Sequence, residues 1–159
     1  MIKIKQYKSI VLPIKTSKEN IDYLFKCNKE TAKVWNECIR LHKKLWTEKQ
    51  EYVDRKYLQD HIKGSFSNIL AAKCMQITIK KYLQAVKAVQ QARKIGRTDE
   101  KYPWRQKKNY NTTWDNTQLK IDYDKNIIRT PRPKYFNVVI DGKRKLNPLF
   151  LKFRTKLPP

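Results

Sequence analysis

The stretch from Tyr102 to Asn116 interleaves four aromatic side chains with three cationic ones. The aromatic residues are Tyr102, Trp104, Tyr110 and Trp114, and the cations are Arg105, Lys107 and Lys108. Flat rings and guanidinium planes stack on unpaired bases, and cations neutralise phosphates and release condensed counterions. The stretch therefore favours contact with nucleic acid. The alternative is that its aromatic rings belong to the core of a small domain while the lysines solvate the surface.

The net charge of the whole chain favours the first interpretation. Its 159 residues include 37 Lys and Arg against 14 Asp and Glu, which gives a formal net charge of +23 at pH 7. Such an imbalance argues against an enzyme of small neutral metabolites and indicates a polyanionic partner. Hydrophobic residues make up 40% of the chain and aromatic residues 11%. This is not the composition of a disordered basic tail, so the chain should fold.

Long polar side chains also follow one face of a predicted helix. They recur at intervals of three and four residues: Lys73, Gln76, Lys80, Gln84 and Lys87. Lys side chains in such a stripe can contact phosphates, and Gln side chains can read base edges. The alternative is an ordinary solvated helix face.

No catalytic or metal-binding set accompanies these residues. His42 and His61 lack the spacing of metal ligands, and the three cysteines form no Cys-x-x-Cys pair. We expect Cys38 and Cys74 to be half-buried apolar side chains on helices. The Asp and Glu residues fall mostly in predicted turns, caps and loops, unlike the clustered carboxylates of a two-metal nuclease. We therefore expect no catalytic residue, no metal and no cofactor in this chain.

The sequence predicts neither export nor membrane insertion. The longest apolar run after the basic amino terminus is Ile10-Val11-Leu12, which is far shorter than the apolar region of a signal peptide. No segment approaches the roughly 18 apolar residues of a membrane span. We expect a cytoplasmic, nucleoid-associated protein without a membrane partner.

The elements that would position the candidate residues begin with a strand and a long helix. Apolar residues at even positions within residues 2–14 predict a strand with one buried face, ended by Pro13. Thr16 and Glu19 have the spacing of a capping box. Apolar residues then recur at three- and four-residue steps, which predicts one long helix or two collinear ones from about Ser17 to Trp46, with Trp46 on the apolar face.

Further helices and short strands follow. Asp54 is the predicted N-cap of a short helix that Gly64 closes, and Ser65 or Ser67 is expected to start another helix that Gly96 stops. Together these elements predict a bundle of three or four helices.

The remaining residues are typical of short strands. Leu119–Asp122 and Ile127–Arg129 predict a hairpin, Tyr135–Ile140 a further strand that ends at the tight turn Asp141-Gly142, and Leu149–Phe153 a last alternating strand. The order strand, helices, strands indicates an α+β fold in which a helical unit is inserted after the first strand.

Three segments occur in an order that we associate with one protein family. Ala32–Ile39 is similar to its Arg-Phe-Val-Tyr-Asn helix, Ser67–Val89 to its second long helix, and Tyr102–Lys108 to its Phe-Pro-Arg-Phe-Lys-x-Lys turn. The layout resembles the N-terminal half of the TnpB proteins, the OrfB products of insertion sequences. These are RNA-guided DNA nucleases of transposable elements and relatives of type V CRISPR effectors.

The resemblance implies a fold and a division into domains. It predicts a partial wedge β-barrel of the oligonucleotide-binding (OB) type with an inserted recognition lobe of three to four helices. Residues 1–15 would be the first wedge strand, residues 16–98 the recognition lobe, and residues 99–159 the remaining wedge strands of an incomplete barrel. The RuvC-like nuclease domain and zinc ribbon of the family are absent from the sequence, and magnesium would belong to that nuclease domain.

The resemblance also implies roles for individual residues. Four of them match positions that contact the short DNA motif flanking the target: Lys73, Gln76, Asp115 and Asn116. Asp115 departs from the family, because an acid repels phosphate. Four others would face the RNA scaffold or the guide duplex: Trp104, Arg105, Lys107 and Lys108. Lys80 and Trp114 complete the set of candidate nucleic-acid-binding residues.

Three functions follow as alternatives. The chain can be the non-catalytic part of a split or truncated RNA-guided nuclease, which holds guide RNA and double-stranded target DNA while a separate nuclease half cleaves. It can be part of a larger enzyme of that family. It can also be a stand-alone basic RNA- or DNA-binding protein of ribosomal or nucleoid type, which shares the charge but not the order of motifs.

Overall fold

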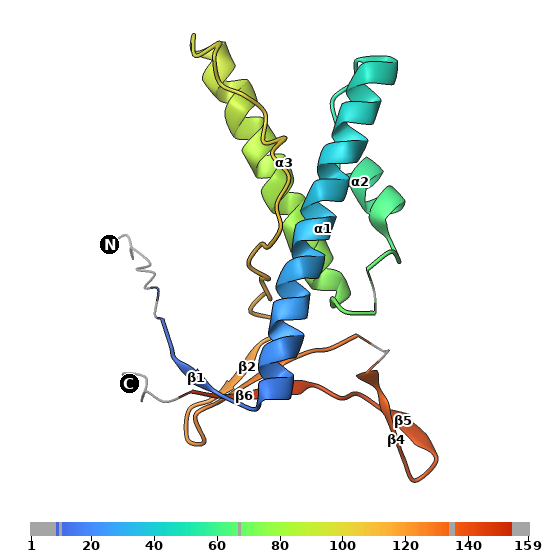
Figure 1. The fold of residues 1–159 in the computed structure, drawn as a ribbon, viewed down its shortest axis with the longest axis vertical. Helices are drawn as coiled ribbons and strands as arrows, with labels where there is room; N and C mark the ends of the chain where they lie inside the picture. Colours follow the sequence, from blue (N-terminus) through green and yellow to red (C-terminus); the bar gives the residue numbers. More distant parts are fainter. Residues whose placement is uncertain (1–8, 10, 67, 134–135, 154–159) are drawn as a thin grey trace, which may run out of the picture.

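Two long helices rise from an antiparallel sheet, and a shorter helix lies beside them (Figure 1). The computed structural model describes residues 9, 11–66, 68–133 and 136–153. All three helices follow β1 in the chain and precede the other strands. The predicted α+β class is therefore confirmed.

Helix α1 (Lys18–Lys49) has its N-cap at Ser17, one residue later than the predicted cap Thr16. Ser17 has extended backbone angles, and its hydroxyl accepts a hydrogen bond from the Asn20 amide at 3.2 Å. The Thr16 hydroxyl accepts instead from the Asn20 side chain at 2.8 Å. The predicted capping box of Thr16 and Glu19 is therefore wrong, because Ser17 caps the helix and Glu19 falls within its first turn.

Helix α2 (Arg55–Ile62) has the predicted N-cap, since the Asp54 carboxylate accepts from the Tyr57 amide at 2.8 Å. Gly64 follows it with a φ of 83°, as expected of a closing glycine. Helix α3 (Ala72–Lys94) has Ala71 as its N-cap, without a side-chain hydrogen bond, so the predicted start at Ser65 is wrong. Ser67 lies outside the described residues.

The late start of α3 has a tertiary cause. The Leu70 amide donates to Phe66 O at 3.1 Å, which forms a turn ahead of the helix. The Ile69 carbonyl in this turn accepts the Tyr23 hydroxyl of α1 at 3.0 Å. The residues that precede α3 are therefore held against α1 in a turn, and the helix begins only after them. At the other end, Gly96 has a φ of 100° and stops the helix as predicted.

The core lies between α1 and α3 and continues into the sheet. Trp35 of α1 meets Tyr82 of α3 edge to face, with ring centroids 5.2 Å apart, and Leu151 of the sheet joins the same cluster. Cys38 and Cys74 are fully buried rather than half-buried, with exposures of 0% and 1%. Burial raises the pKa of both thiols to about 12.

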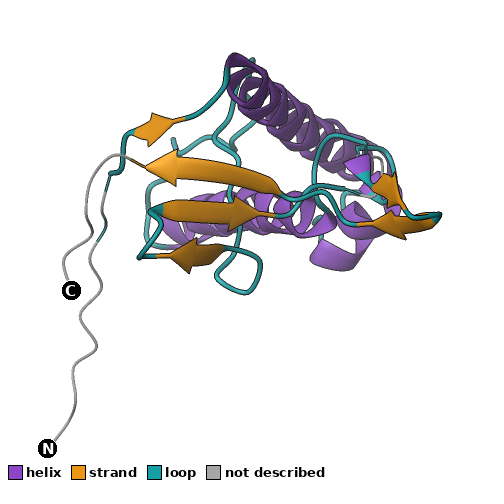
Figure 2. Ribbon diagram, turned by 90° about the horizontal axis from the view of Figure 1, so that it is seen from below, coloured by secondary structure: helices purple, strands orange, loops and turns teal. Residues whose placement is uncertain are grey.

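The main sheet has the order β1-β6-β3-β2, and each pair in it is antiparallel. Its strands are β1 (Ile14–Lys15), β2 (Lys120–Asp122), β3 (Ile127–Thr130) and β6 (Leu149–Phe153). Leu149, Leu151 and Phe153 are buried in alternation with exposed neighbours, so the alternation predicted for β6 is confirmed. The predicted hairpin is β2–β3. Figure 2 shows the sheet from below, lying across the ends of the long helices.

Two predictions about the sheet need correction or stay open. The first strand begins after Pro13 instead of ending there, because proline has no N–H for the ladder that Ile14 and Lys15 form with β6. Residues 1–8 and 10 of that predicted strand lie outside the described residues. The described strands form no closed barrel, since β1 and β2 are the two ends of the sheet. The OB-like wedge therefore stays a prediction.

A separate two-stranded ribbon lies beyond the sheet (Figure 1). It consists of β4 (Val138–Ile140) and β5 (Lys143–Lys145). Asp141 and Gly142 join them with φ angles of 51° and 72°, the pattern of a type I′ turn. The predicted tight turn is confirmed, and the strand before it is shorter than expected. Tyr135 lies outside the described residues.

Candidate nucleic-acid interface

The chain between α3 and β2, residues 95–119, runs from the far end of the helices back to the sheet (Figure 1). We call these residues the connecting segment. They contain neither helix nor strand, so contacts with the helices must fix their position. Seven of the ten candidate residues lie on this segment.

Two asparagines of α1 hold the connecting segment by its backbone. The Asn36 side chain donates to Lys107 O at 2.9 Å and accepts from Lys107 N–H at 2.8 Å. The Asn28 side chain accepts from the Thr112 amide and hydroxyl at 3.1 and 3.0 Å. The Tyr110 amide also donates to the Asn28 carbonyl at 3.2 Å. Side-chain amides thus replace the missing backbone ladder along this side of α1.

The aromatic rings of the segment pack against the helical core. Trp104, Tyr110 and Trp114 are partly buried there, and Tyr110 lies 5.0 Å from Trp35 between ring centroids. The alternative interpretation, that these rings belong to the core of a small domain, therefore holds for the buried part of each ring. They are only half-buried, so part of each ring stays exposed.

Trp104 is tied to a buried histidine. Its indole N–H donates to His42 Nδ1 at 3.2 Å, and the Tyr82 hydroxyl lies 2.7 Å from the same nitrogen. Because an indole nitrogen only donates, His42 Nδ1 is the acceptor and the ring is neutral. Burial lowers the pKa of His42 below its ordinary value. The histidine therefore links α1, α3 and the connecting segment in its neutral form.

Cations lie over the rings along this path. Lys107 Nζ is 4.9 Å from the ring centroids of both Trp35 and Tyr110. Lys43 Nζ is 5.3 Å from Trp104, and Arg93 Cζ is 4.7 Å from the Tyr102 ring. Ring contacts orient these cations without cancelling their charge.

Few carboxylates neutralise the cations in the described part of the chain. Ion pairs there join Lys33 to Glu30, Arg40 to Glu37 and Lys73 to Asp115. Of the candidate lysines and arginines, Lys73 is the one so paired among the described residues. Chemically, the connecting segment can bind an anion along its length.

Asp115 is an acidic residue at a position predicted to contact DNA, and its interactions within the chain explain its presence there. Its carboxylate lies 3.5 Å from Lys73 Nζ and accepts hydrogen bonds from the Thr117 hydroxyl and the Gln118 amide at 2.6 and 3.1 Å. The Thr117 bond is the main cause that lowers the pKa of Asp115, with Lys73 contributing. Asp115 therefore holds the turn before β2 and joins it to the start of α3.

The other predicted residues are dispersed. Lys80 is exposed on α3, Gln76 is half-buried there, and Arg105, Lys108 and Asn116 are exposed on the connecting segment. Gln76 lines a cavity of about 460 Å³ between α2 and α3. Gln76 thus borders the packed helices, while Lys80 is open to solvent.

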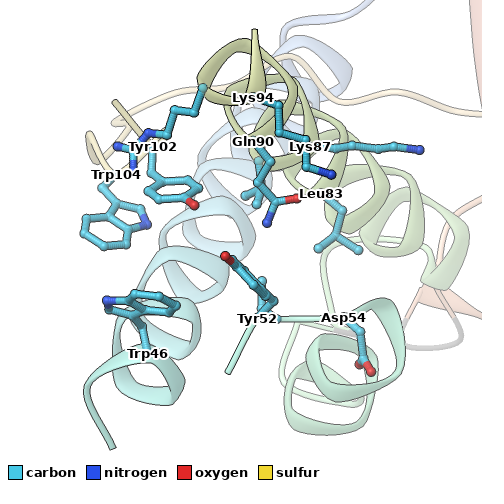
Figure 3. Close-up of a pocket in the computed structure, with 12 residues that line it drawn as sticks. Trp46, Tyr52, Asp54, Leu83, Lys87, Gln90, Lys94, Tyr102 and Trp104 are labelled. Carbon is cyan, nitrogen blue, oxygen red and sulfur yellow. The ribbon is translucent and has the colours of Figure 1, made fainter. Parts of the chain in front are cut away.

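A larger hollow, which the sequence did not predict, lies at the end of the helices far from the sheet. It has a volume of about 920 Å³ and is lined by four aromatic side chains among others: Trp46, Tyr52, Tyr102 and Trp104. We call it the aromatic cavity (Figure 3). Trp46, expected on the apolar face of α1, is 41% exposed. The sequence contained one signal for this cavity, because two aromatic residues, Trp46 and Tyr52, lie close together around the end of α1.

The ribbon is a second surface that sequence reasoning did not single out. Its apolar strand is exposed, with Val139 at 67%, and faces a strand of three cations in the register Val138–Lys145, Val139–Arg144 and Ile140–Lys143. A two-stranded ribbon of this kind fits the major groove of duplex DNA.

Within the described residues, no group of three or more His, Cys, Asp and Glu is placed to hold a metal ion. None of the helices in that part of the chain is long and apolar enough to cross a membrane. No family model matches the chain, and comparisons with curated proteins and with solved structures find no significant match.

Proposed function

We propose that this chain binds nucleic acid as the wedge and recognition-lobe part of a TnpB-like RNA-guided DNA endonuclease. In this function it holds guide RNA and the DNA that flanks the target, inside the cytoplasm, and it does not cleave by itself. The nuclease activity and its magnesium belong to another domain or polypeptide. The observation that carries the proposal is the connecting segment with its surroundings, where Lys107, Lys43 and Arg93 lie over half-buried aromatic rings and form no ion pair with any described residue.

The electrostatics favour a backbone of phosphates as the ligand. The formal net charge is +23, and each cation that neutralises a phosphate releases a counterion. Because Asn28 and Asn36 fix the backbone of the segment, its cations are held in place before binding. Less conformational entropy is then lost when the complex forms.

The topology supports the family within this proposal. Strand β1 pairs with β6, and the helices lie between them in the chain. The strands before and after the helical unit thus belong to one sheet, as expected of a recognition lobe inserted into a wedge domain. A gene that continues beyond Pro159 into a frame with a strand-end Asp and a Cys-x-x-Cys pair would support this family. A gene that ends there without a companion nuclease would favour the second candidate.

The second candidate is a stand-alone basic protein, and the ribbon favours it. An exposed apolar strand beside Lys143, Arg144 and Lys145 can enter a groove as an arm. For this function we expect a ribbon variant with all three cations changed to Gln to lose more affinity than any variant of the connecting segment. The reverse ranking supports the first candidate.

The decisive test compares two triple variants of equal charge. Arg105→Gln, Lys107→Gln and Lys108→Gln remove the cations of the segment, whereas Lys44→Gln, Lys56→Gln and Lys63→Gln remove exposed cations of α1 and the α2 region. Binding of a structured RNA is measured at several salt concentrations. Three lost phosphate contacts should reduce the slope of log K against log salt by about 2 to 3, and the control should change it less. Equal losses in both variants would refute the segment as the binding site.

A further inference from the structure

The aromatic cavity is built from three separate parts of the chain. Trp46 and Tyr52 come from the end of α1 and the turn after it, and Tyr102 and Trp104 come from the connecting segment. The remaining wall comes from α3 and from Val53 and Asp54, which precede α2. Figure 3 shows the Tyr102–Trp104 pair across the hollow from the Trp46–Tyr52 pair. The volume of about 920 Å³ lies in the range of small-molecule sites.

The rings offer flat surfaces rather than a closed core. Tyr102 and Trp104 are stacked, with centroids 5.5 Å apart and planes 24° from parallel. Trp46 and Tyr52 lie 5.6 Å apart at 41°, and their exposures are 41% and 61%. The Trp104 N–H is already bound by His42, so this side chain offers its face to a ligand and not its hydrogen bond.

The polar groups of the cavity select an anionic ligand. Lys87, Gln90 and Lys94 of α3 line the cavity, with Gln90 pointing toward Tyr52 and Lys87 extending away from the rings (Figure 3), and Arg93 lies over the Tyr102 ring. Among the described residues that line the cavity, Asp54 is the single carboxylate, and it is occupied in capping α2. Three cations against one carboxylate oppose a cationic ligand such as a quaternary ammonium group, which aromatic cages otherwise hold.

We propose that the aromatic cavity binds one unpaired nucleotide of the RNA that the connecting segment holds. The base stacks on the exposed rings, Gln90 contacts its edge, and Lys87 and Lys94 contact the adjoining phosphates. Stacking on aromatic side chains accepts every base, because each base has a π face. This inference rests on the proposed function, since it assumes an RNA ligand. It adds to that function a site that recognises an unpaired nucleotide.

The test uses two hairpin RNAs that differ in one bulged nucleotide. Wild type should bind the bulged hairpin more tightly than the fully paired one. Trp46→Ala and Tyr52→Ala should each reduce the affinity for the bulged RNA by about 5- to 150-fold, the loss of one stacked base, and leave the paired RNA unchanged. Tyr123→Ala is the control, because Tyr123 is 64% exposed in the β2–β3 turn far from the cavity.

The outcomes separate the two proposals. If wild type binds both hairpins equally, or if the two cavity variants weaken both alike, the cavity does not read an unpaired base although the chain binds RNA. If wild type binds neither hairpin, the proposed function fails and this inference fails with it. Thermal unfolding of each variant checks the fold, and Gln90→Ala, which removes no ring, gives a second measure of the preference for the bulge.

Discussion

Replacing Asn36 by Ala should loosen the connecting segment without changing any charge. The Asn36 side chain makes two hydrogen bonds to the backbone of Lys107, at 2.9 and 2.8 Å. A net contribution of about 0.5 to 1.5 kcal/mol for each bond gives a loss of about 1 to 3 kcal/mol. Because Lys107 is half-buried, water can reach its backbone in part, and we expect the middle of that range.

Urea unfolding and calorimetry measure this loss. For a chain of this size, about 2 kcal/mol lowers Tm by roughly 4 to 8 °C. The Lys107 amide should exchange its hydrogen faster, and RNA affinity should fall although every cation remains. Asn109→Ala is the matched control, because Asn109 is exposed on the same segment. A free energy of unfolding within about 0.5 kcal/mol of wild type, the usual range of surface substitutions, would refute the reasoning.

Two further predictions concern the buried histidine and the half-buried glutamine. Burial lowers the pKa of His42 below 6.5, so the unfolded chain takes up this proton first as pH falls, and stability is lost progressively below about pH 6.5 by at most about 1.4 kcal/mol per pH unit. In urea titrations at several pH values, His42→Gln should flatten this dependence and His61→Gln should keep it; identical profiles for wild type and His42→Gln would contradict the assignment. If Gln76 reads the target-flanking DNA, Gln76→Ala should flatten motif preference in a randomised-flank selection with the RNA and the nuclease half, whereas a changed Tm with unchanged preference would indicate a packing role beside the 460 Å³ cavity.

Local sequence signals correctly predicted those helix ends that depend on interactions between neighbouring residues. Asp54 and Gly96 lie at helix ends because a side-chain acceptor and a left-handed glycine suffice there. Ser65 failed as a start because a distant contact, Tyr23 to Ile69 at 3.0 Å, holds the preceding turn. No local pattern contains that contact, which spans 46 residues.

The candidate site follows the same division. Composition identified the connecting segment, but its position depends on Asn28 and Asn36, which bind it across 71 to 84 residues of sequence. From the sequence alone, an acidic residue at position 115 was unexpected in a DNA contact, and the structure explains it by its ion pair with Lys73. The aromatic cavity was missed because its walls come from separate parts of the chain that only the fold brings together.

The salt dependence of RNA binding tests the central claim most directly. The wild-type chain is titrated with a structured RNA and with duplex DNA between about 50 and 200 mM salt. For roughly six neutralised phosphates, we expect a line of log K against log salt with a slope of about −5 on duplex DNA. A slope near zero, or no binding at the lowest salt, would contradict the claim that the charge of this chain serves a polyanion.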